Sequence, residues 1–267
     1  MKGHLHLTAS ADAAGRTYLS AQSFRAPMHL SKPHTDEGAL VVNVVNPTAG
    51  LFDGDEVEMH VKVEPGAHLV LTTPSAGRVY RSRTERPAVV SQHMEVAAGG
   101  FAEYFPELFI PQGGARYSQR TTLRVAPGGR LLFCEWLAPG RVASGETFAY
   151  EELLWDTDLW CAETLTARER YRITPHDDSL APLKAVSPAA HYMAFFAVGW
   201  QEWPVEALAT LTGNGISIGH GPLAGNNVAH IVKAICPDSL EARRTYRNVR
   251  NILYSCLGKR EPALRRT

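Results

Sequence analysis

Polar and apolar residues alternate along three stretches of the chain, each followed by a glycine corner and then by an apolar run. The alternating stretches are residues 57–63, 92–96 and 121–125, and the corners contain Gly66, Gly99 and Gly128. Alternation with a period of two is typical of a half-buried β-strand, and glycine adopts the positive φ that many tight corners require. The pattern therefore predicts three strand–turn–strand units.

The three units follow one another at intervals of about 30 residues, the length at which one supersecondary unit stacks on the next. The apolar runs after the corners, such as residues 69–71 and 131–133, carry hydrophobic side chains at consecutive positions. Strands of this kind need cover on both faces. We therefore expect a mostly β fold of stacked or packed β-sheets, solenoid-like or sandwich-like, built by repetition.

The last third of the sequence has a different pattern. Residues 191–198, 216–218 and 228–234 are typical of strands, and Pro204 is well placed in the first turn of a short helix. A longer helix is expected after Asp238, which has a capping-box-like relation to Glu241. We predict a β core over residues 1–185 and, over residues 186–267, a C-terminal α+β portion with about two helices. This portion packs on the core, either as a second domain or as part of a single one.

Composition limits the possible environments and partners. The 27 basic and 27 acidic side chains balance, so net charge predicts neither nucleic-acid binding nor attraction to an anionic membrane. No apolar run reaches the ~18 residues that a membrane span needs. The four cysteines lie far apart and form no Cys-x-x-Cys motif, which favours a reduced chain. We expect a cytoplasmic protein.

The sequence contains little that indicates catalysis. Residues 215–219 match the Gly-x-Ser-x-Gly motif of serine hydrolases around Ser217. That motif needs a strand-to-helix turn, whereas Pro222 and Gly225 follow here. Glu135 and Glu146 are a weaker candidate, as the acid/base pair of a hydrolase, because nothing in their placement gives a reason for one raised pKa. We expect a protein that is not an enzyme.

Five motifs, in order, resemble those of the urease accessory protein D (UreD/UreH) family. They lie at residues 46–55, 65–68, 73–82, 140–148 and 169–170. The resemblance implies a mostly β accessory protein without catalysis of its own. It also implies binding to apo-urease and to a helical accessory subunit of the UreF type, which recruits a GTPase of the UreG type that delivers nickel. The chain departs from the family pattern at residues 137–141 and in its tail, residues 263–267.

The resemblance also indicates which residues could pass nickel. The acids in or near the matching motifs are Asp55, Glu135, Glu146 and Glu169, and we predict that they mark a transient nickel path, with no permanently bound cofactor. Glu135 is the most suggestive, because a carboxylate in an apolar run is costly unless it is paired, hydrated or coordinating. The alternative is a structural ion pair, with Arg141 or Arg170 as its partner.

Two loops are candidates for partner binding. Tyr80 and Arg81 lie in an arginine-rich loop, which is either an interface or a solvated hairpin tip. Leu108, Phe109 and Ile110 lie among turn residues. This apolar loop either packs over the core or is exposed and binds a partner.

Two alternatives remain open. The chain could be a freestanding β-repeat module that binds a glycan or a protein and transfers no metal. Tyrosines and tryptophans would then line its binding groove. Separately, His4 and His6 would point to the same side of a strand, as metal ligands or simply as exposed polar side chains.

Overall fold

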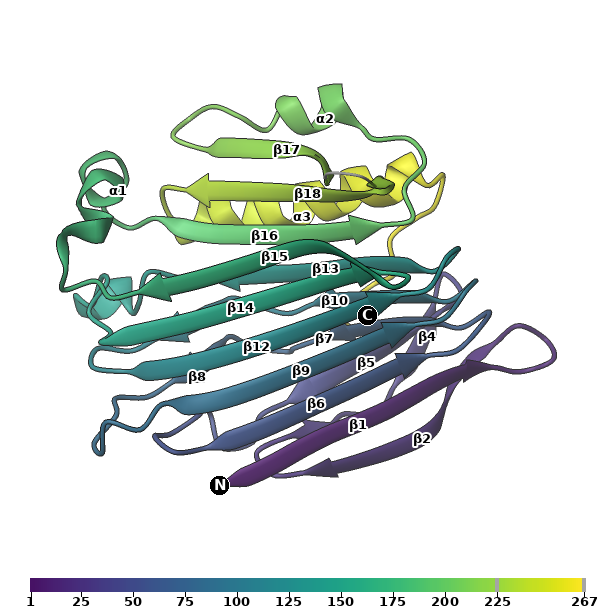
Figure 1. Cartoon of the computed structure of the whole chain (residues 1–267), viewed down its shortest axis with the longest axis horizontal. Helices are drawn as coiled ribbons and strands as arrows, with labels where there is room; N and C mark the ends of the chain where they lie inside the picture. The colour runs from purple at the N-terminus through teal and green to yellow at the C-terminus, as the bar shows by residue number, and fades with distance from the viewer. Residues whose placement is uncertain (224–225, 266–267) are drawn as a thin grey trace.

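The computed structural model describes residues 1–223 and 226–265 and shows two β-sheets that face each other, with a helical layer at one end (Figure 1). The seven-stranded sheet has the order β15-β14-β12-β9-β6-β1-β2. Its strands are β1 (Lys2–Ala11), β2 (Thr17–Arg25), β6 (Glu56–Val63), β9 (Ala88–Val96), β12 (Arg116–Val125), β14 (Glu152–Cys161) and β15 (Thr164–Ile173).

The eleven-stranded sheet lies behind it, with the main order β17-β18-β16-β13-β10-β7-β5-β3. The strands of this order are β3 (His29–Leu30), β5 (Ala39–Val45), β7 (His68–Thr72), β10 (Phe101–Phe105), β13 (Arg130–Leu137), β16 (His191–Val198), β17 (Ser217–Leu223) and β18 (Asn226–Cys236). Three short strands join its margins: β4 (His34–Asp36), β8 (Gly77–Val79) and β11 (Phe109–Pro111).

The chain winds between the sheets as a solenoid. Strands β6, β9 and β12 of the seven-stranded sheet each turn through a short corner into β7, β10 and β13 of the other sheet, and each set pairs in parallel. The corner glycines Gly66, Gly99 and Gly128 have φ of 76°, 73° and 77°. They also stack, since the N–H of Gly66 donates to Gly99 and that of Gly99 to Gly128. The predicted repeats are therefore the coils of the solenoid.

Apolar side chains from both sheets fill the space between them. Strand β6 alternates exposed and buried positions along its whole length, so its inner face contributes Val57, Met59, Val61 and Val63. The strands opposite are buried on both faces, as the apolar runs predicted, because a second layer covers their outer side.

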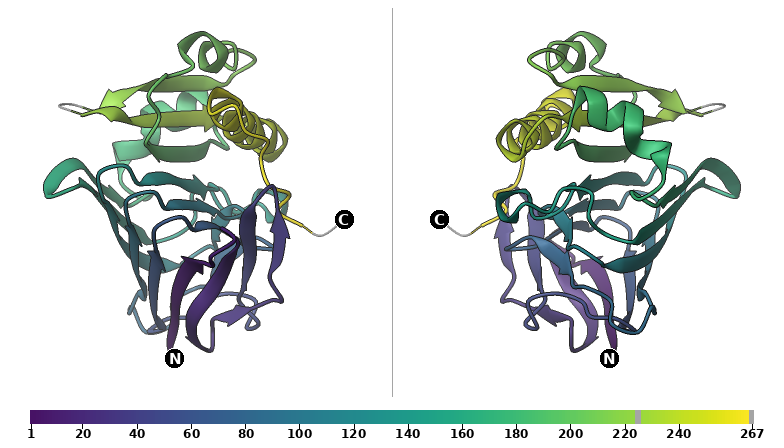
Figure 2. Two further views of the ribbon diagram at one scale, coloured as in Figure 1. Left: turned by 90° about the vertical axis from the view of Figure 1, so that its right-hand side faces the viewer. Right: turned by 90° about the vertical axis from the view of Figure 1, so that its left-hand side faces the viewer.

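The C-terminal residues continue the larger sheet and then cover it. Strand β16 pairs antiparallel with β13, and β18 and β17 follow. The long helix α3 (Ser239–Cys256) packs its apolar stripe on the outer face of this sheet, with Leu253 and Val249 fully buried (Figure 2). Asp238 caps α3, because its carboxylate accepts the N–H groups of Leu240 and Glu241.

Two shorter helices complete the fold, α1 (Ala181–Val186) and α2 (Val205–Ala209). The prediction of a mostly β, repeat-built fold is confirmed, and so are the helices after Pro204 and Asp238. Helix α1 was not anticipated, because its six residues lie in a stretch without a longer apolar period. Ser217 begins strand β17, as expected, and is exposed. The boundary at residues 185 and 186 stays a prediction.

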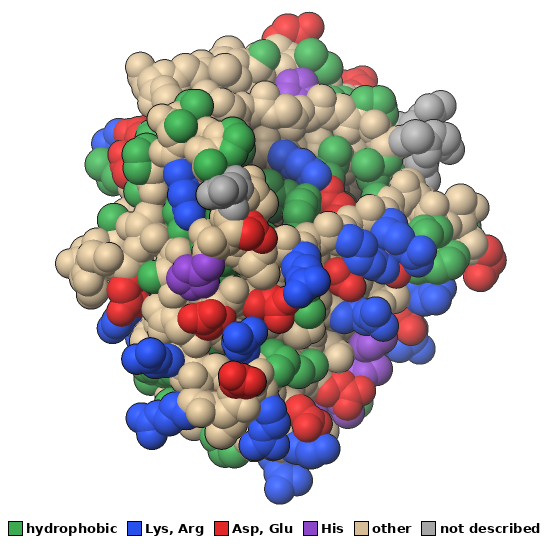
Figure 3. All heavy atoms as spheres, turned by 60° about the vertical axis from the view of Figure 1, so that its left-hand side comes forward, with side chains coloured by type: hydrophobic (Ala, Val, Ile, Leu, Met, Phe, Trp, Pro, Cys, Tyr) green, Lys and Arg blue, Asp and Glu red, His purple; other side chains and the backbone are tan. Residues whose placement is uncertain are grey.

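The outer surface carries both charge signs. Figure 3 shows basic and acidic side chains interspersed over one face of the molecule. Within residues 1–223 and 226–265, no helix is long and apolar enough to cross a membrane.

Candidate functional site

The space between the sheets contains a buried acid, Glu135, which is 6% exposed. It lies on β13, and its Oε1 accepts two hydrogen bonds: one from the indole N–H of Trp155 at 2.6 Å and one from the amide of Gln119 at 3.0 Å. Both donors are neutral and come from the facing sheet. No basic side chain among residues 1–223 and 226–265 forms an ion pair with this carboxylate.

The hydrogen bonds continue from Glu135 along the inner face of the seven-stranded sheet. The hydroxyl of Tyr117 donates to Gln119 at 2.8 Å, and the amide of Gln119 also reaches Thr121 at 3.2 Å. Thr121 in turn lies 3.4 Å from Gln92 on the next strand. A row of polar groups thus crosses an otherwise apolar interior.

Burial raises the pKa of Glu135 to about 7. The hydrogen bond from Trp155 opposes this rise, and the negative charge of Glu169 adds to it. Near neutral pH the carboxyl group is therefore balanced between its protonated and charged forms, as is common at functional sites.

Glu169 lies on β15, the edge strand of the seven-stranded sheet, where this sheet meets the C-terminal strands of the other. It forms an ion pair with Lys233, so β15 of one sheet is joined to β18 of the other. The hydroxyl of Tyr171 donates to Glu169 at 2.8 Å, lies 2.8 Å from the hydroxyl of Tyr192 and accepts a hydrogen bond from Lys233 at 2.9 Å. This edge of the interior is closed by polar side chains.

Two cavities meet at Glu135. One, of about 130 Å³, extends from Glu135 and Trp155 to Tyr171 and Tyr192 and is otherwise lined by apolar side chains. The other, of about 110 Å³, shares Glu135 and Trp155, and its lining also includes the polar groups of Gln92, Thr73 and Glu107. Glu135 therefore borders both cavities.

The structure brings two of the four predicted acids together and leaves the other two elsewhere. Glu169 is close enough to Glu135 to raise its pKa. Asp55 instead pairs with the amino group of Met1 and accepts the N–H of Phe52 at 2.9 Å. Glu146 pairs with Arg141 and accepts the N–H of Gly113 at 2.8 Å. Asp55 and Glu146 thus stabilise turns.

The alternative for Glu135, an ion pair with Arg141 or Arg170, is wrong. Arg141 is taken by Glu146, and Arg170 pairs with Asp156 and Asp158. The reason is the alternation along β15: Glu169 points inward, so its neighbour Arg170 points to solvent. Among the described residues, Glu135 and Glu146 have no hydrogen-bond partner in common, so the structure does not favour an acid/base pair.

Tyr80 lies in an aromatic pair at the surface. Its ring stacks on Phe52 with centroids 4.8 Å apart and an angle of 8°, and Phe52 is 44% exposed. Arg81 is exposed beside it. Residues 46–55 and 78–86 thus meet in a surface of aromatic rings and arginines.

The apolar segment at Leu108, Phe109 and Ile110 is half-buried, and its last two residues belong to strand β11. Phe109 packs inward, with its ring 4.5 Å from Tyr117 and 5.5 Å from Trp155. Of the two alternatives for this segment, packing over the core holds for Phe109. Leu108 also packs against buried side chains, beneath α3.

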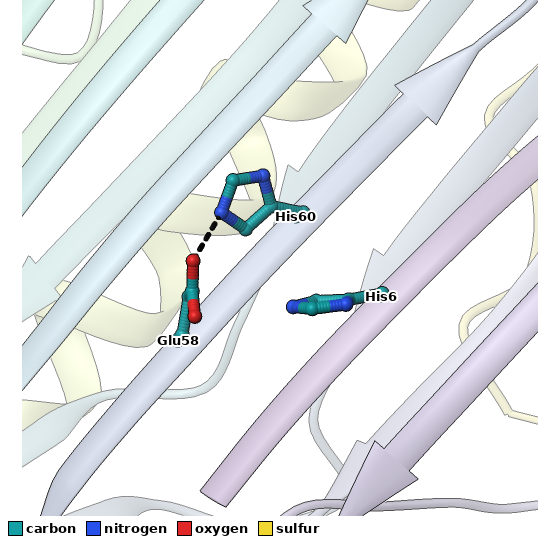
Figure 4. A group of neighbouring side chains, drawn as sticks. All are labelled: His6, Glu58 and His60. Carbon is teal, nitrogen blue, oxygen red and sulfur yellow. Dashed lines mark hydrogen bonds and ion pairs between the residues drawn. The ribbon is translucent and has the colours of Figure 1, made fainter.

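A second polar cluster, which sequence reasoning found only in part, lies on the outer face of the seven-stranded sheet. His4 and His6 do share one side of β1, with ring centroids 4.8 Å apart. His6 faces His60 on β6, and Glu58 bonds His60 at 2.6 Å (Figure 4). Burial and the neighbouring imidazoles lower the pKa of His6.

The repeats contained a signal for this cluster. His60 stands six residues before Gly66, and His93 stands six residues before Gly99. Coils that stack in register place such residues side by side, and His60 and His93 are indeed opposite each other. Lys233, Tyr171 and Tyr192 at the closed edge had no comparable signal, because they come from strands outside the repeats.

The sequence is similar to urease accessory proteins over its full length. It matches the family model described as UreD urease accessory protein over residues 1–267. It is 37% identical to the urease accessory protein UreD of Opitutus terrae, over 94% of this chain and 93% of that relative. It is 31% identical to the protein of that name from Mycolicibacterium gilvum, over 90% of each chain. The chain belongs to the UreD family of urease accessory proteins.

Proposed function

We propose that the chain acts in urease maturation as a non-catalytic scaffold, and that nickel passes through the gap between its two sheets by way of Glu169 and Glu135. Nickel is the cargo here and not a resident cofactor. The observation that supports this route is the position of Glu135, a buried carboxyl group between two cavities.

The chemistry of Glu135 suits the transfer of a divalent cation. Its pKa of about 7 means that the proton is released easily when a cation arrives, and the site then gains a negative charge. Carboxylate, amide and hydroxyl oxygens bind a hydrated divalent ion weakly enough for release. At the closed edge, a cation would replace Lys233 as the partner of Glu169.

The proposed partners are apo-urease, the helical UreF-type subunit and, through it, the UreG-type GTPase. The surface formed by Phe52, Tyr80 and Arg81 supports a protein contact, because aromatic and arginine side chains are enriched in interfaces. We expect Tyr80→Ser to weaken co-purification with one of these partners while leaving the fold intact. Unchanged recovery of every partner would remove Tyr80 from the interface.

The nickel route is tested by Glu135→Gln in cells that express urease with all accessory proteins. Because both donors bond the same oxygen, Oε1, a glutamine carbonyl can accept both hydrogen bonds while the charge is lost. We expect urease activation to fall by about tenfold, which corresponds to ~1.4 kcal/mol on the transfer step. Glu169→Gln should act in the same direction.

Glu146→Gln is the matched control, since it removes a carboxylate that is engaged with Arg141 at a turn. It should leave activation close to the wild-type level. Each variant must also co-purify with its partners in normal amounts, so that loss of binding is separated from loss of transfer. Full activation by a folded, partner-bound chain that carries both Glu135→Gln and Glu169→Gln would exclude the route.

A further inference from the structure

Three imidazoles form a row across the outer face of the seven-stranded sheet. His6, His60 and His93 occupy the same register on β1, β6 and β9, which are parallel neighbours. The ring centroids of His6 and His60 are 5.1 Å apart, and those of His60 and His93 are 4.6 Å apart. Neighbouring strands are separated by about 4.8 Å, so the backbone itself sets this spacing.

A carboxylate completes the group. Glu58 lies two residues before His60 and therefore on the same face of β6, and its Oε1 is 2.6 Å from Nε2 of His60. Figure 4 shows the side chains of Glu58, His60 and His6 projecting from the two adjacent strands, with Glu58 directed toward the ring of His60. All three are exposed.

We propose that His6, Glu58 and His60 form a surface binding site for a divalent transition-metal ion such as nickel or zinc. One donor atom from each of the three lies within 4.8 Å of the other two. Ligands about 2.1 Å from one ion stand roughly 3 Å apart, so small side-chain rotations would bring the three atoms into a coordination sphere. Exposed side chains make such rotations freely.

The donor set decides which ions fit. Two imidazoles and one carboxylate suit nickel, zinc and copper, whereas magnesium and calcium prefer oxygen ligands alone. The remaining coordination positions face solvent and stay occupied by water. The site is therefore open and exchangeable, unlike a closed structural site.

The surroundings leave the three ligands available. Lys62, two residues after His60 on β6, is neutralised by an ion pair with Glu64 at 2.8 Å. His4 bonds Ser23 at 2.8 Å and lies beside His6. His93 stacks on His60 and supports the orientation of that ring.

The surface site goes beyond the proposed nickel route, and each of the two proposals can be tested without the other. Alternation along the strands places His60 outside and Met59 inside the sheet. Glu135 is inside, among Trp155 and Gln119. Changes at Glu135 should therefore leave the surface site unaltered.

The test is titration of the untagged full chain with nickel chloride by isothermal calorimetry. We expect His60→Ala and Glu58→Gln each to weaken binding of one nickel equivalent by about tenfold or more, as loss of a ligand does. His176→Ala is the matched control, because His176 is an exposed imidazole with its own carboxylate neighbour, Glu151, at 3.7 Å. X-ray absorption of the nickel-loaded wild type should show imidazole ligands that decrease in His6→Ala.

Each other outcome overturns the proposal. Equal affinities of the wild type and His60→Ala would show that nickel binds elsewhere. An equal loss in His176→Ala would show unspecific binding to surface imidazoles. If Glu135→Gln abolished the titrated equivalent while His60→Ala kept it, the ion would belong to the interior, which would support the proposed route and reject the surface site.

Discussion

The indole N–H of Trp155 donates a 2.6 Å hydrogen bond to Glu135 across the interior, from β14 of one sheet to β13 of the other. The contact fixes a titratable group in the middle of an apolar core. Burial of this group makes the stability of the fold depend on the protonation of Glu135, whereas the hydrogen bond from Trp155 favours the charged form.

The first prediction concerns pH. The folded chain raises the pKa of Glu135 from 4.5 to about 7, so between these values the folded state holds a proton that the unfolded state has released. The contribution of Glu135 to the free energy of unfolding is therefore full below about pH 4.5 and declines by about 3 kcal/mol as pH rises through 7. Urea unfolding of the wild type and of Glu135→Gln at about pH 5 and 8 measures it. The difference between the two proteins must change with pH in this direction, and a constant difference would contradict the raised pKa.

The second prediction concerns the donor. Trp155→Phe removes the N–H that stabilises the charged form of Glu135, so the pKa of Glu135 should rise further and the free energy of unfolding should fall by about 1–3 kcal/mol. Urea unfolding measures the loss, and NMR titration of the Glu135 carboxyl carbon reports the pKa. Trp160→Phe, on the same strand beside Arg124, is the control and should leave the pKa of Glu135 unchanged. An unshifted pKa in Trp155→Phe would show that the hydrogen bond does not hold the charge.

The third prediction concerns the ion pair beneath helix α3. Arg250 and Glu103 are both buried, and the guanidinium bonds the carboxylate through Nε and Nη2. Glu103→Gln removes the buried counter-charge of Arg250, which keeps only its ion pair with the more exposed Glu261 at 3.1 Å, and should cost about 3 kcal/mol of unfolding free energy. Glu241→Gln, which breaks the exposed pair with Arg244, should cost under about 0.5 kcal/mol. Similar losses in chemical denaturation would mean that burial of the first pair has no special energetic effect.

The fourth prediction concerns a solenoid corner. A Cβ at Gly128 would meet nothing within 4 Å, so its φ of 77° is the only obstacle to alanine. Gly128→Ala should therefore cost about 1–2 kcal/mol from backbone strain alone. Gly219 also has open space around it but lacks a positive φ, and Gly219→Ala should change the melting temperature little. An unchanged melting temperature in Gly128→Ala would show that the backbone of the corner adjusts to accept the side chain.

The repeated units could be predicted from the sequence because every coil repeats the same pattern of an alternating strand and a glycine corner. The alternation of residues 57–63 and the glycine at position 66 recur with the same spacing in the next coil, so strand, corner and inner face follow directly. The N-terminal cap of the last helix, Asp238, was equally local. Helix α1 and strand β16's pairing with β13 depend on long-range contacts and left no such pattern.

The candidate site was less predictable because it, too, depends on contacts between residues far apart in the sequence. Glu135 stands out in sequence as an acid in an apolar run, but its partners Trp155 and Gln119 are set by how the sheets face each other. The histidine row depends on β1 pairing in parallel with β6, and β1 lies outside the repeats. The sequence showed the shared side of His4 and His6, and the equal spacing of His60 and His93 from their corners, but not that the two pairs would be neighbours.

The short corners and the longer returns of the solenoid lie at opposite ends of the coils. At the corner end, Gly66, Gly99 and Gly128 are locked to one another by backbone hydrogen bonds. At the return end lie the segments that carry Phe52, Tyr80 and Glu146. An insertion at the return end would lengthen a loop, whereas an extra residue in a corner would break the stacked hydrogen bonds that join Gly66, Gly99 and Gly128. The return end can therefore vary in loop length, whereas the stacked corners require turns of constant length.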